Sequence, residues 1–456
     1  IMSEIKVNKI SPRAACGTVT LGDSGDTFTI PSGATINNQG TATNFGATGA
    51  VNWQTTVKTS GFTASNGEGY FVDTNSGPIS VNLPAGTAGA IVAFKDYRDT
   101  FDTSALTLVQ NGSDKIGGST TNAVINEEGI AITLVFIDST RGWLVTDSGL
   151  QSEAALPSFV AATGGNTVAN SPCGNFKVHT FTGPGTFCVS NAGNAAGSNS
   201  VEYIVVAGGG AGGVNRRGGG GAGGFRFASP TLAPATYPAK PLAGPANISV
   251  TATSFPITVG GGATGSCSPT PNDGSVSTFS TITSAGGGGA FTQTPSSAGN
   301  GGPGGSGGGG YESSGSGGSG NTPPVSPAQG TDGGTGGPGG SNSGGGGGGA
   351  LVAGTNQNPS NPGAPGGNGA GVPNAFGTSG QNCGSFYYFS GGGGGGTSCA
   401  GSASTGGLGG GGAGNASGGT GTAGTTNTGG GGGGAGQGGG GSNGGSGIVI
   451  IRYKFQ

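Results

Sequence analysis

Glycine dominates the second half of this sequence and restricts what the chain can fold into. The 456 residues include 114 glycines and 25 prolines, with unbroken glycine runs at 344–349 and 391–396. A segment without side chains buries little apolar surface, so a hydrophobic core cannot hold it. Ordering each glycine also costs about 1–2 kcal/mol of backbone entropy. The tract from Gly208 to Gly447 must therefore be held by its own backbone or stay unfolded.

Three interpretations of this tract compete. Disorder is typical of sequences rich in glycine and proline that lack a period. Collagen requires glycine at every third position, and the runs at 344–349 and 391–396 have no such register. The third interpretation, which we adopt, is a bundle of extended polyglycine II helices with about three residues per turn. Their N–H and C=O groups point outward, so each helix must hydrogen-bond to its neighbours, and only glycine lets backbones approach closely on several sides.

Two apolar segments bracket the tract. "VEYIVV" (Val201–Val206) precedes it and "IVIIRYKF" (Ile448–Phe455) follows it, and both are rich in β-branched and aromatic residues. We expect these two strands to pair in one sheet. The whole tract is then a single insertion, with both of its ends anchored at one base.

The first part of the chain is predicted to be all-β. Residues 1–50 are short β-runs with few apolar residues, and we expect them to complete their core with other chains. Residues 51–150 carry strand signals at short spacing, such as "GYFVDT" and "IAITLVFIDS", separated by glycine-containing turns. Residues 151–158 are interpreted as a linker, and a C-terminal domain spans 159–456. The predicted core residues of the 51–150 domain are Trp53, Phe94, Phe136 and Trp143.

Charge and cysteine usage exclude several classes of protein. Only 7% of residues are charged and the net charge is −3, so no basic surface indicates nucleic-acid binding. No apolar run is long enough to insert in a membrane. The six cysteines form no CxxC pair, which argues against a metal site; Cys173 and Cys188 could bridge, and free thiols are an equal alternative.

The sequence also lacks the parts of an active site. His179, the single histidine, lies in the β-run "FKVHTF", where histidine is more often structural than catalytic. A glycosidase needs two carboxylates about 5–10 Å apart. The acids of the tract are Asp273, Glu312 and Asp332, and those elsewhere are interpreted as solvated turns (Asp96, Asp99, Asp102, Glu127, Glu128). We predict that this protein is not an enzyme and that it has no catalytic residue, no bound metal and no cofactor.

Longer stretches resemble a known family. "MSEIKVNKISPRAACGTVTLGDSGDTFTIPSGATI", the strands of residues 69–147, and "KVHTFTGPGTFCVS" with the bracketing strands resemble tail-fibre proteins of marine bacteriophages. The tract is also similar to the tip adhesins of T-even phages, in which polyglycine helices carry receptor-binding loops. The resemblance implies a homotrimer made in the host cytoplasm and located in the virion tail. Its N-terminus would attach to other tail proteins and its C-terminal part would bind a host glycan or outer-membrane protein.

Non-glycine interruptions of the tract are the predicted receptor loops. If glycine helices alternate in direction, the segments Tyr311–Gln329, Val372–Ser390 and Asn415–Thr428 lie at the far end, and Thr397–Thr405 lies at the base, which separates Cys383 from Cys399. The aromatic quartet at 386–389 is the foremost candidate, and packing of these rings on the bundle or on a neighbouring subunit is an equal alternative. The predicted receptor-binding residues are Tyr311, Phe376, Phe386, Tyr387, Tyr388, Phe389, Asn415 and Asn427.

Two further function classes stay open. A purely structural virion fibre or decoration protein would have the same composition without a receptor role. An ice- or surface-binding protein would also use glycine-rich helices, but the β-rich domains ahead of the tract disfavour it.

Overall fold

The computed structural model has two units, Ile1–Ala155 and Leu156–Gln456, which are described separately. It describes residues 10, 19–20, 27, 29, 51–150, 157–171, 174–230, 232, 236–265, 272–290, 299–338, 343–358, 363–397, 403–416 and 418–456. Most of the predicted attachment segment 1–50 and of the linker 151–158 lies outside this set. Helical structure among the described residues is limited to two 3-10 turns, so the fold is all-β as predicted.

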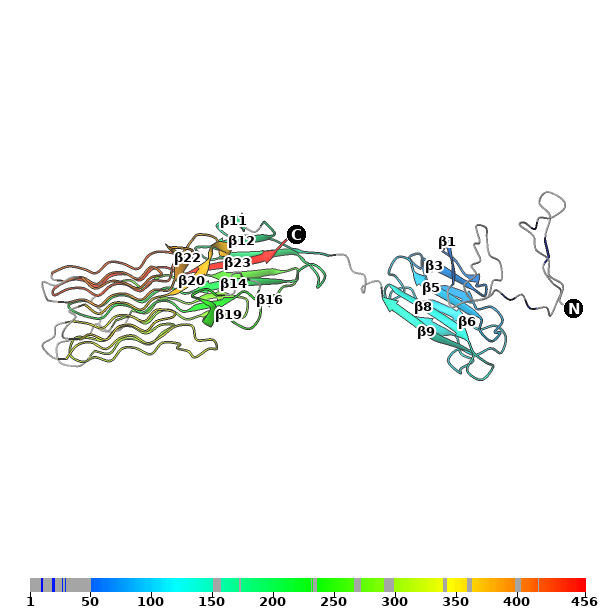
Figure 1. Ribbon diagram of the computed structural model, residues 1–456, viewed down its shortest axis with the longest axis horizontal. Helices are drawn as coiled ribbons and strands as arrows, with labels where there is room; N and C mark the ends of the chain where they lie inside the picture. Colours follow the sequence, from blue (N-terminus) through cyan, green and yellow to red (C-terminus); the bar gives the residue numbers. More distant parts are fainter. Residues whose placement is uncertain are drawn as a thin grey trace. The chain divides into compact units, whose positions relative to one another are not determined.

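The described residues of the first unit form two sheets (Figure 1). One has the strand order β1-β3-β5-β8-β9 and the other the order β2-β4-β6-β7. Both sheets contain parallel and antiparallel pairs: β3 pairs with β5 in parallel, and β5 pairs with β8 in antiparallel register. The strands are β1 (Asn52–Lys58), β2 (Phe62–Thr63), β3 (Glu68–Val72), β4 (Ile79–Asn82), β5 (Ile91–Asp96), β6 (Leu106–Val109), β7 (Ala123–Ile125), β8 (Ile130–Phe136) and β9 (Trp143–Leu150).

Alternation of apolar residues builds one core in this unit. In β4 the pattern is buried, exposed, buried, exposed, as expected for a strand with one face packed. Phe94, Phe136 and Trp143 lie in this core as predicted. The prediction for Trp53 is wrong, because its side chain remains 39% exposed. It stacks on Phe71 with ring centroids 5.0 Å apart and covers Gly69, on the side of the sheet away from the core.

The β-rich part of the second unit comprises several sheets joined at one end of the glycine tract (Figure 1). The central sheet has the order β11-β12-β23-β14-β15, a second has β10-β13-β17-β18-β19, and a third has β20-β22-β21. The elements are β10 (Val160–Thr163), β11 (Thr167–Asn170), β12 (Phe176–Phe181), β13 (Gly185–Ala192), β14 (Ser200–Val206), β15 (Phe225–Ala228), η2 (Lys240–Leu242), β16 (Ile248–Ser249), β17 (Ser254–Thr258), β18 (Ser277–Phe279), β19 (Ile282–Ser284), β20 (Ala370–Pro373), η3 (Asn374–Phe376), β21 (Gln381–Cys383), β22 (Phe386–Phe389) and β23 (Ile448–Lys454).

The bracketing strands pair as the sequence predicted. β14 and β23 are antiparallel neighbours, with Val206 opposite Ile448 at the end next to the glycine tract. Both faces of this pair are buried. Ile204 and Ile450 pack into one core, and Val205 and Val449 pack into a second core on the other face. Burial on both faces explains why these strands read as continuous apolar runs rather than as alternating ones.

Between these strands, the glycine tract forms long extended segments that run side by side (Figure 1). The backbone hydrogen bonds of one segment, 208–213, rotate through three neighbours with N···O distances of 2.8–3.0 Å. Residues 208 and 211 donate to segment 272–275, residues 209 and 212 to segment 442–445, and residues 210 and 213 to segment 218–221. The partner therefore repeats every three residues, which equals the number of residues per turn of the predicted helix.

The segment 219–224 shows the same repeat with another set of neighbours. Its residues 219 and 222 donate to segment 345–348, residues 220 and 223 to segment 429–432, and residues 221 and 224 to segment 285–288. Each segment is thus bonded on several sides, whereas a β-strand has only two neighbours in its sheet. Glycine makes this approach possible, because a Cβ at Gly220 would overlap the carbonyl oxygen of Gly210.

We call the end of the bundle next to β14 and β23 the base, and the opposite end the tip. Segment 208–213 ascends from the base, the chain turns at 214–217, and segment 218–224 descends again. Asn215 and Arg216 have φ values of 51° and 65°, so this tip turn uses the left-handed region.

The predicted placement of the loops is partly wrong. Val372–Ser390 lies at the base, where β20 and β22 pack against the core that contains Ile204. Thr397 lies at the tip, because the neighbouring Gly396 N–H donates to the carbonyl of Arg217 in the tip turn (2.8 Å). Cys399, and with it the predicted separation from Cys383, is outside the described residues.

Turns made almost entirely of glycine account for these errors. The chain reverses at 407–410 and 436–439, where Gly409, Gly410 and Gly438 have φ values of 105°, 89° and 77°. The prediction instead treated each non-glycine interruption as one turn. Asn415–Thr428 consequently contains a whole descending segment, with Asn415 at the tip and Thr428 at the base.

His179 is a core residue, in agreement with the structural role predicted for it. Its Nδ1 is 2.7 Å from the carbonyl oxygen of Gly164, and its Nε2 is 3.0 Å from the hydroxyl of Tyr453. Burial lowers the pKa of His179 below its ordinary value.

We predict that Gly220→Ala destabilises the second unit by about 1–3 kcal/mol or more, because the new methyl group has no space among backbone atoms. Denaturant unfolding of the full chain measures this change. Gly261→Ala is the matched control, since no heavy atom lies within 4 Å of the added Cβ. Equal effects of the two substitutions would contradict tight backbone packing.

A pH dependence follows from His179. The pKa of His179 is lower in the folded protein than in the unfolded chain. As the pH falls below about 6.5, the unfolded chain therefore binds a proton at His179 before the folded protein does. The contribution of His179 to stability is complete above that pH and is lost as the pH falls through the lowered pKa. We expect the free energy of unfolding to fall less between pH 7 and 5 in His179→Gln than in the unchanged protein. Parallel curves for the two proteins would contradict this.

Candidate functional site

The predicted receptor aromatics of β22 and η3 lie at the base. Phe376 and Phe389 are each 1% exposed, and Phe376 packs edge-on against Phe227 with centroids 5.7 Å apart. Phe386 and Tyr387 pack partly buried against the same core. The Tyr388 ring covers Gly371 on the neighbouring strand. The rings of the quartet thus pack on the base of this chain, and their receptor role stays a prediction.

Tyr311 lies at the tip, where it joins a charged cluster. Its hydroxyl donates to Glu312 Oε1 (2.7 Å), and the same oxygen is 3.4 Å from Arg216 Nη2. The Arg217 guanidinium lies over the Tyr311 ring, 5.0 Å from its centroid. Burial and the hydrogen bond to Glu312 raise the pKa of Tyr311, so the phenol keeps its proton and acts as a donor. We call Arg216, Arg217, Tyr311 and Glu312 the tip cluster.

The two predicted asparagines lie at opposite ends of the bundle. At the tip, Asn415 accepts from the N–H of Thr397 (3.0 Å) and its own N–H donates to Gly434 (2.9 Å). Asn427 belongs to a basal turn, where its Oδ1 is 3.1 Å from the hydroxyl of Ser446. Of the predicted receptor residues, the structure brings only Tyr311 and Asn415 to the tip.

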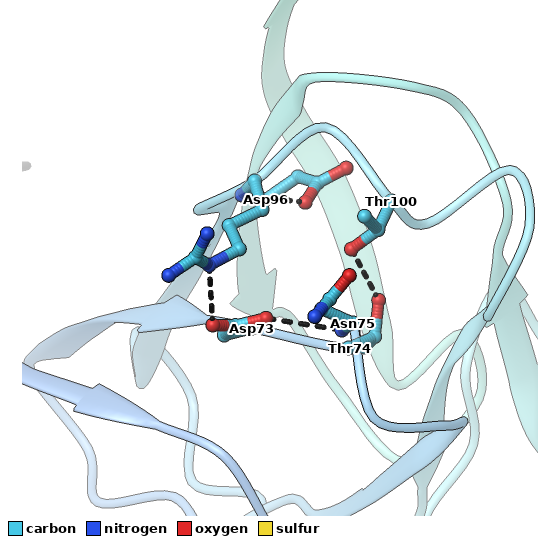
Figure 2. Close-up of polar contacts among 6 residues, drawn as sticks. Asp73, Thr74, Asn75, Asp96 and Thr100 are labelled. Carbon is cyan, nitrogen blue, oxygen red and sulfur yellow. Dashed lines mark hydrogen bonds and ion pairs between the residues drawn. The ribbon is translucent and has the colours of Figure 1, made fainter.

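Acidic residues of the first unit form structural contacts (Figure 2). Asp73 accepts from Arg98 Nε (2.8 Å) and from the N–H of Asn75 (3.0 Å), and the hydroxyls of Thr74 and Thr100 are 2.9 Å apart. Asp96 was predicted to lie in a solvated turn, but it is buried. Its carboxylate accepts the N–H groups of Phe101 and Gly129 at 3.0 and 3.1 Å, which explains how the charge is tolerated.

A buried ion pair in the second unit escaped the sequence analysis. Arg452 on β23 pairs with Glu202 on β14, and the two side chains are 4% and 3% exposed. The Arg452 guanidinium also stacks on the Phe176 ring, 3.6 Å from its centroid. The sequence did contain a signal for this ion pair. Glu202 and Arg452 each interrupt an apolar strand segment, and these two segments were predicted to pair.

Other candidate sites can be assessed only within the described residues. Cys188 and Cys383 carry free thiols, whereas Cys173, the possible partner of Cys188, is not described. No group of metal-binding side chains gathers in the part of the chain that the structure covers. Nor does any helix of the described segments have the length and apolar character to span a bilayer.

Comparison with known protein families covers most of the chain. Residues 182–454, which hold the three-residue repeat, match the family model described as a glycine-rich domain. The chain belongs to this glycine-rich domain family. Residues 22–150 match the model described as bacteriophage T4 gp9/10-like protein, N-terminal. No curated protein matches the chain.

The N-terminal match bears on function. The match of residues 22–150 to a phage protein model supports the interpretation that this chain is a phage tail fibre or tail structural protein. Such a protein is located in the virion. The phage tail family described by this N-terminal model is structural rather than enzymatic. In the glycine tract, Asp273 and Asp332 each accept a backbone N–H, from Gly289 (2.8 Å) and Gly320 (2.7 Å).

We predict that Glu202→Ala costs about 3–5 kcal/mol of stability, because it leaves the Arg452 charge buried without this partner. The double variant Glu202→Leu/Arg452→Met should cost less than Glu202→Ala alone. Asp73→Asn is the control, since its partner Arg98 is 58% exposed and such pairs contribute about 1 kcal/mol or less. A double variant as unstable as Glu202→Ala would contradict the assignment of the cost to the loss of this ion pair.

Proposed function

We propose that this protein is a phage tail fibre that binds a host surface receptor through the tip of its glycine bundle. The N-terminal unit would attach to other tail proteins, which the family match of residues 22–150 supports. The observation that carries the receptor role is the tip cluster, where charged and aromatic side chains gather at the end of a bundle otherwise poor in charge.

The bundle itself is proposed to be a polyglycine II assembly. The three-residue rotation of hydrogen-bond partners supports this assignment, because a helix with about three residues per turn directs successive N–H groups to three sides. Such a frame uses main-chain groups for its interior contacts. Residues in the turns can then change without disturbing a core, as in other binding loops that are held by a rigid frame.

Two finer points complete the proposal. The fibre is proposed to be a homotrimer. Exposed apolar side chains on the first unit support this, because contacts between subunits would bury them: Trp53, Val124, Ile137, Val145 and Leu150. The receptor is proposed to be a surface glycan or an outer-membrane protein. The alternative, a fibre without a receptor role, keeps the same fold and assigns the tip cluster to structure alone.

Phage carrying Tyr311→Ala or Asn415→Ala should adsorb to the host at least several-fold more slowly than unchanged phage, because both residues lie at the tip. Tyr388→Ala is the matched control, since Tyr388 lies at the base, and it should leave adsorption unchanged. Adsorption rate constants and direct binding of purified fibre to cells are the measurements, with unfolding curves for each variant. Unchanged adsorption for both tip variants would favour the purely structural fibre, and a loss only in Tyr388→Ala would return receptor binding to the aromatic quartet.

A further inference from the structure

The tip cluster carries more positive than negative charge. Arg216 and Arg217 contribute two guanidinium groups and Glu312 contributes one carboxylate, which leaves one positive charge in excess. Within the glycine tract, only the remaining charged residues could balance it, namely Arg226, Lys240, Asp273 and Asp332.

Three of these residues lie at or near the base. Arg226 is on β15 and Lys240 is in η2, and both elements contribute to the basal core or flank it. Asp332 is also near the base, because the residue before it donates its N–H to the carbonyl of Gly349 (3.1 Å), next to the core residue Ala350. None of the three balances the charge at the tip.

Asp273 lies partway along the bundle. The carbonyl of the residue before it accepts the N–H of Ala211 (3.0 Å), within the ascending segment 208–213 and before the tip turn at 214–217. The Asp273 carboxylate accepts the N–H of Gly289 there (2.8 Å). The net charge of the tip itself is therefore positive.

Arg216 is the charged group of the cluster that a ligand can reach. Its side chain is 23% exposed, whereas Glu312 is 9% exposed and Arg217 is buried. Its contact with Glu312 Oε1 is 3.4 Å long, compared with about 2.7–2.9 Å for a strong charge-assisted bond. Ser313 and Ser314, which follow Glu312, are exposed as well. An anionic group in solvent can thus approach the Arg216 guanidinium directly.

The burial of Arg217 makes the excess charge costly. Arg217 is 7% exposed and lies over the Tyr311 ring. Desolvation by burial lowers the pKa of Arg217, and Tyr311 and Glu312 offset this effect only in part. A further anion at the tip would stabilise the guanidinium groups, because an opposite charge within about 4–6 Å favours the charged form.

The described surface of the tip suits a polar ligand. The large hydrophobic side chains that are exposed in the described part of the second unit are Val168, Val276 and Val352, and all three lie toward the base. Protein interfaces usually bury an apolar core with aromatic anchors. A glycan instead needs hydrogen-bond partners for its hydroxyls, and the exposed Ser313 and Ser314 can both donate and accept.

We propose that the tip cluster binds an acidic glycan, with the carboxylate or phosphate group of one sugar against Arg216. The planar guanidinium matches either group, because both present paired oxygen acceptors. This inference rests on the proposed function and specifies the chemistry of the receptor at the same site.

The test uses the purified full chain on an array of neutral, sialic acid, uronic acid and phosphorylated glycans. Each glycan that binds is titrated as a free oligosaccharide by calorimetry. Arg216→Gln removes the charge and keeps a polar side chain, and we expect it to weaken acidic-glycan binding about tenfold or more, the equivalent of one hydrogen bond to a charged group. Lys240→Gln is the matched control, because it removes the same charge from an exposed side chain at the base, and binding should be unchanged.

Glu312→Gln is a second variant that changes the charge in the opposite direction. It adds one positive charge to the tip, so acidic glycans should bind as tightly as before or more tightly. Raising the salt from about 50 to about 300 mM should weaken binding to the unchanged protein, because the charge is partly exposed. Unfolding midpoints show which variants are folded.

A preference for acidic glycans that Arg216→Gln weakens and Lys240→Gln does not would support the proposal, and the array then tells carboxylate from phosphate. The proposal would be overturned by equal binding of neutral glycans, by no binding of any acidic glycan, or by equal effects of the two substitutions. If Arg216→Gln does not fold, weaker acidic-glycan binding in Glu312→Gln overturns it, and equal or tighter binding supports it.

These outcomes are separate from those of the proposed function. Slower adsorption of Tyr311→Ala phage without acidic-glycan binding would leave the receptor role at the tip and overturn the acidic ligand. Acidic-glycan binding that depends on Arg216, with unchanged adsorption of both Tyr311→Ala and Asn415→Ala phage, would support the anion site and contradict its role as the adsorption receptor site.

Discussion

Backbone hydrogen bonds between extended segments hold the larger unit together, and the rest of its structure depends on them. In segments 208–213 and 219–224, every N–H donates to a carbonyl of a neighbouring segment, so these buried main-chain donors are satisfied without a core. A single bond contributes only about 0.5–1.5 kcal/mol net, but almost every residue of a segment such as 219–224 makes one. Glycine is required because neighbouring main chains occupy the space that a Cβ would need, as at Gly220.

The paired strands β14 and β23 anchor both ends of the glycine bundle. They bring both ends of a tract of more than two hundred residues to one place, and their two buried faces supply the apolar core that glycine cannot. The base is accordingly the part where side chains are constrained, which is why the aromatic residues of β22 and η3 lie there. At the tip, the side chains of the tip cluster are held by an ion pair and a ring contact instead of an apolar core.

Sequence reasoning predicted the strand pairing and the core residues that depend on apolar side chains. It did not predict the course of the chain through the tract, where most residues are glycine. The pairing of Val201–Val206 with Ile448–Phe455 followed from their apolar pattern, and the buried Phe94 and Trp143 followed from strand signals. The direction of each glycine segment was not predicted, because turns such as 407–410 and 436–439 are glycine except for one residue each, Leu408 and Gln437, and lack the run of non-glycine residues that was taken to mark a turn. The buried Asp96 was missed for a related reason, since its partners are main-chain amides.

Amide hydrogen exchange along 218–224 tests the central claim most directly, because it reports on the backbone bonds themselves. If these bonds hold the bundle, the glycine amides exchange as slowly as those of β14 and β23, through opening of the whole unit. Exchange close to that of an unstructured chain would contradict the account, whatever the strands at the base show.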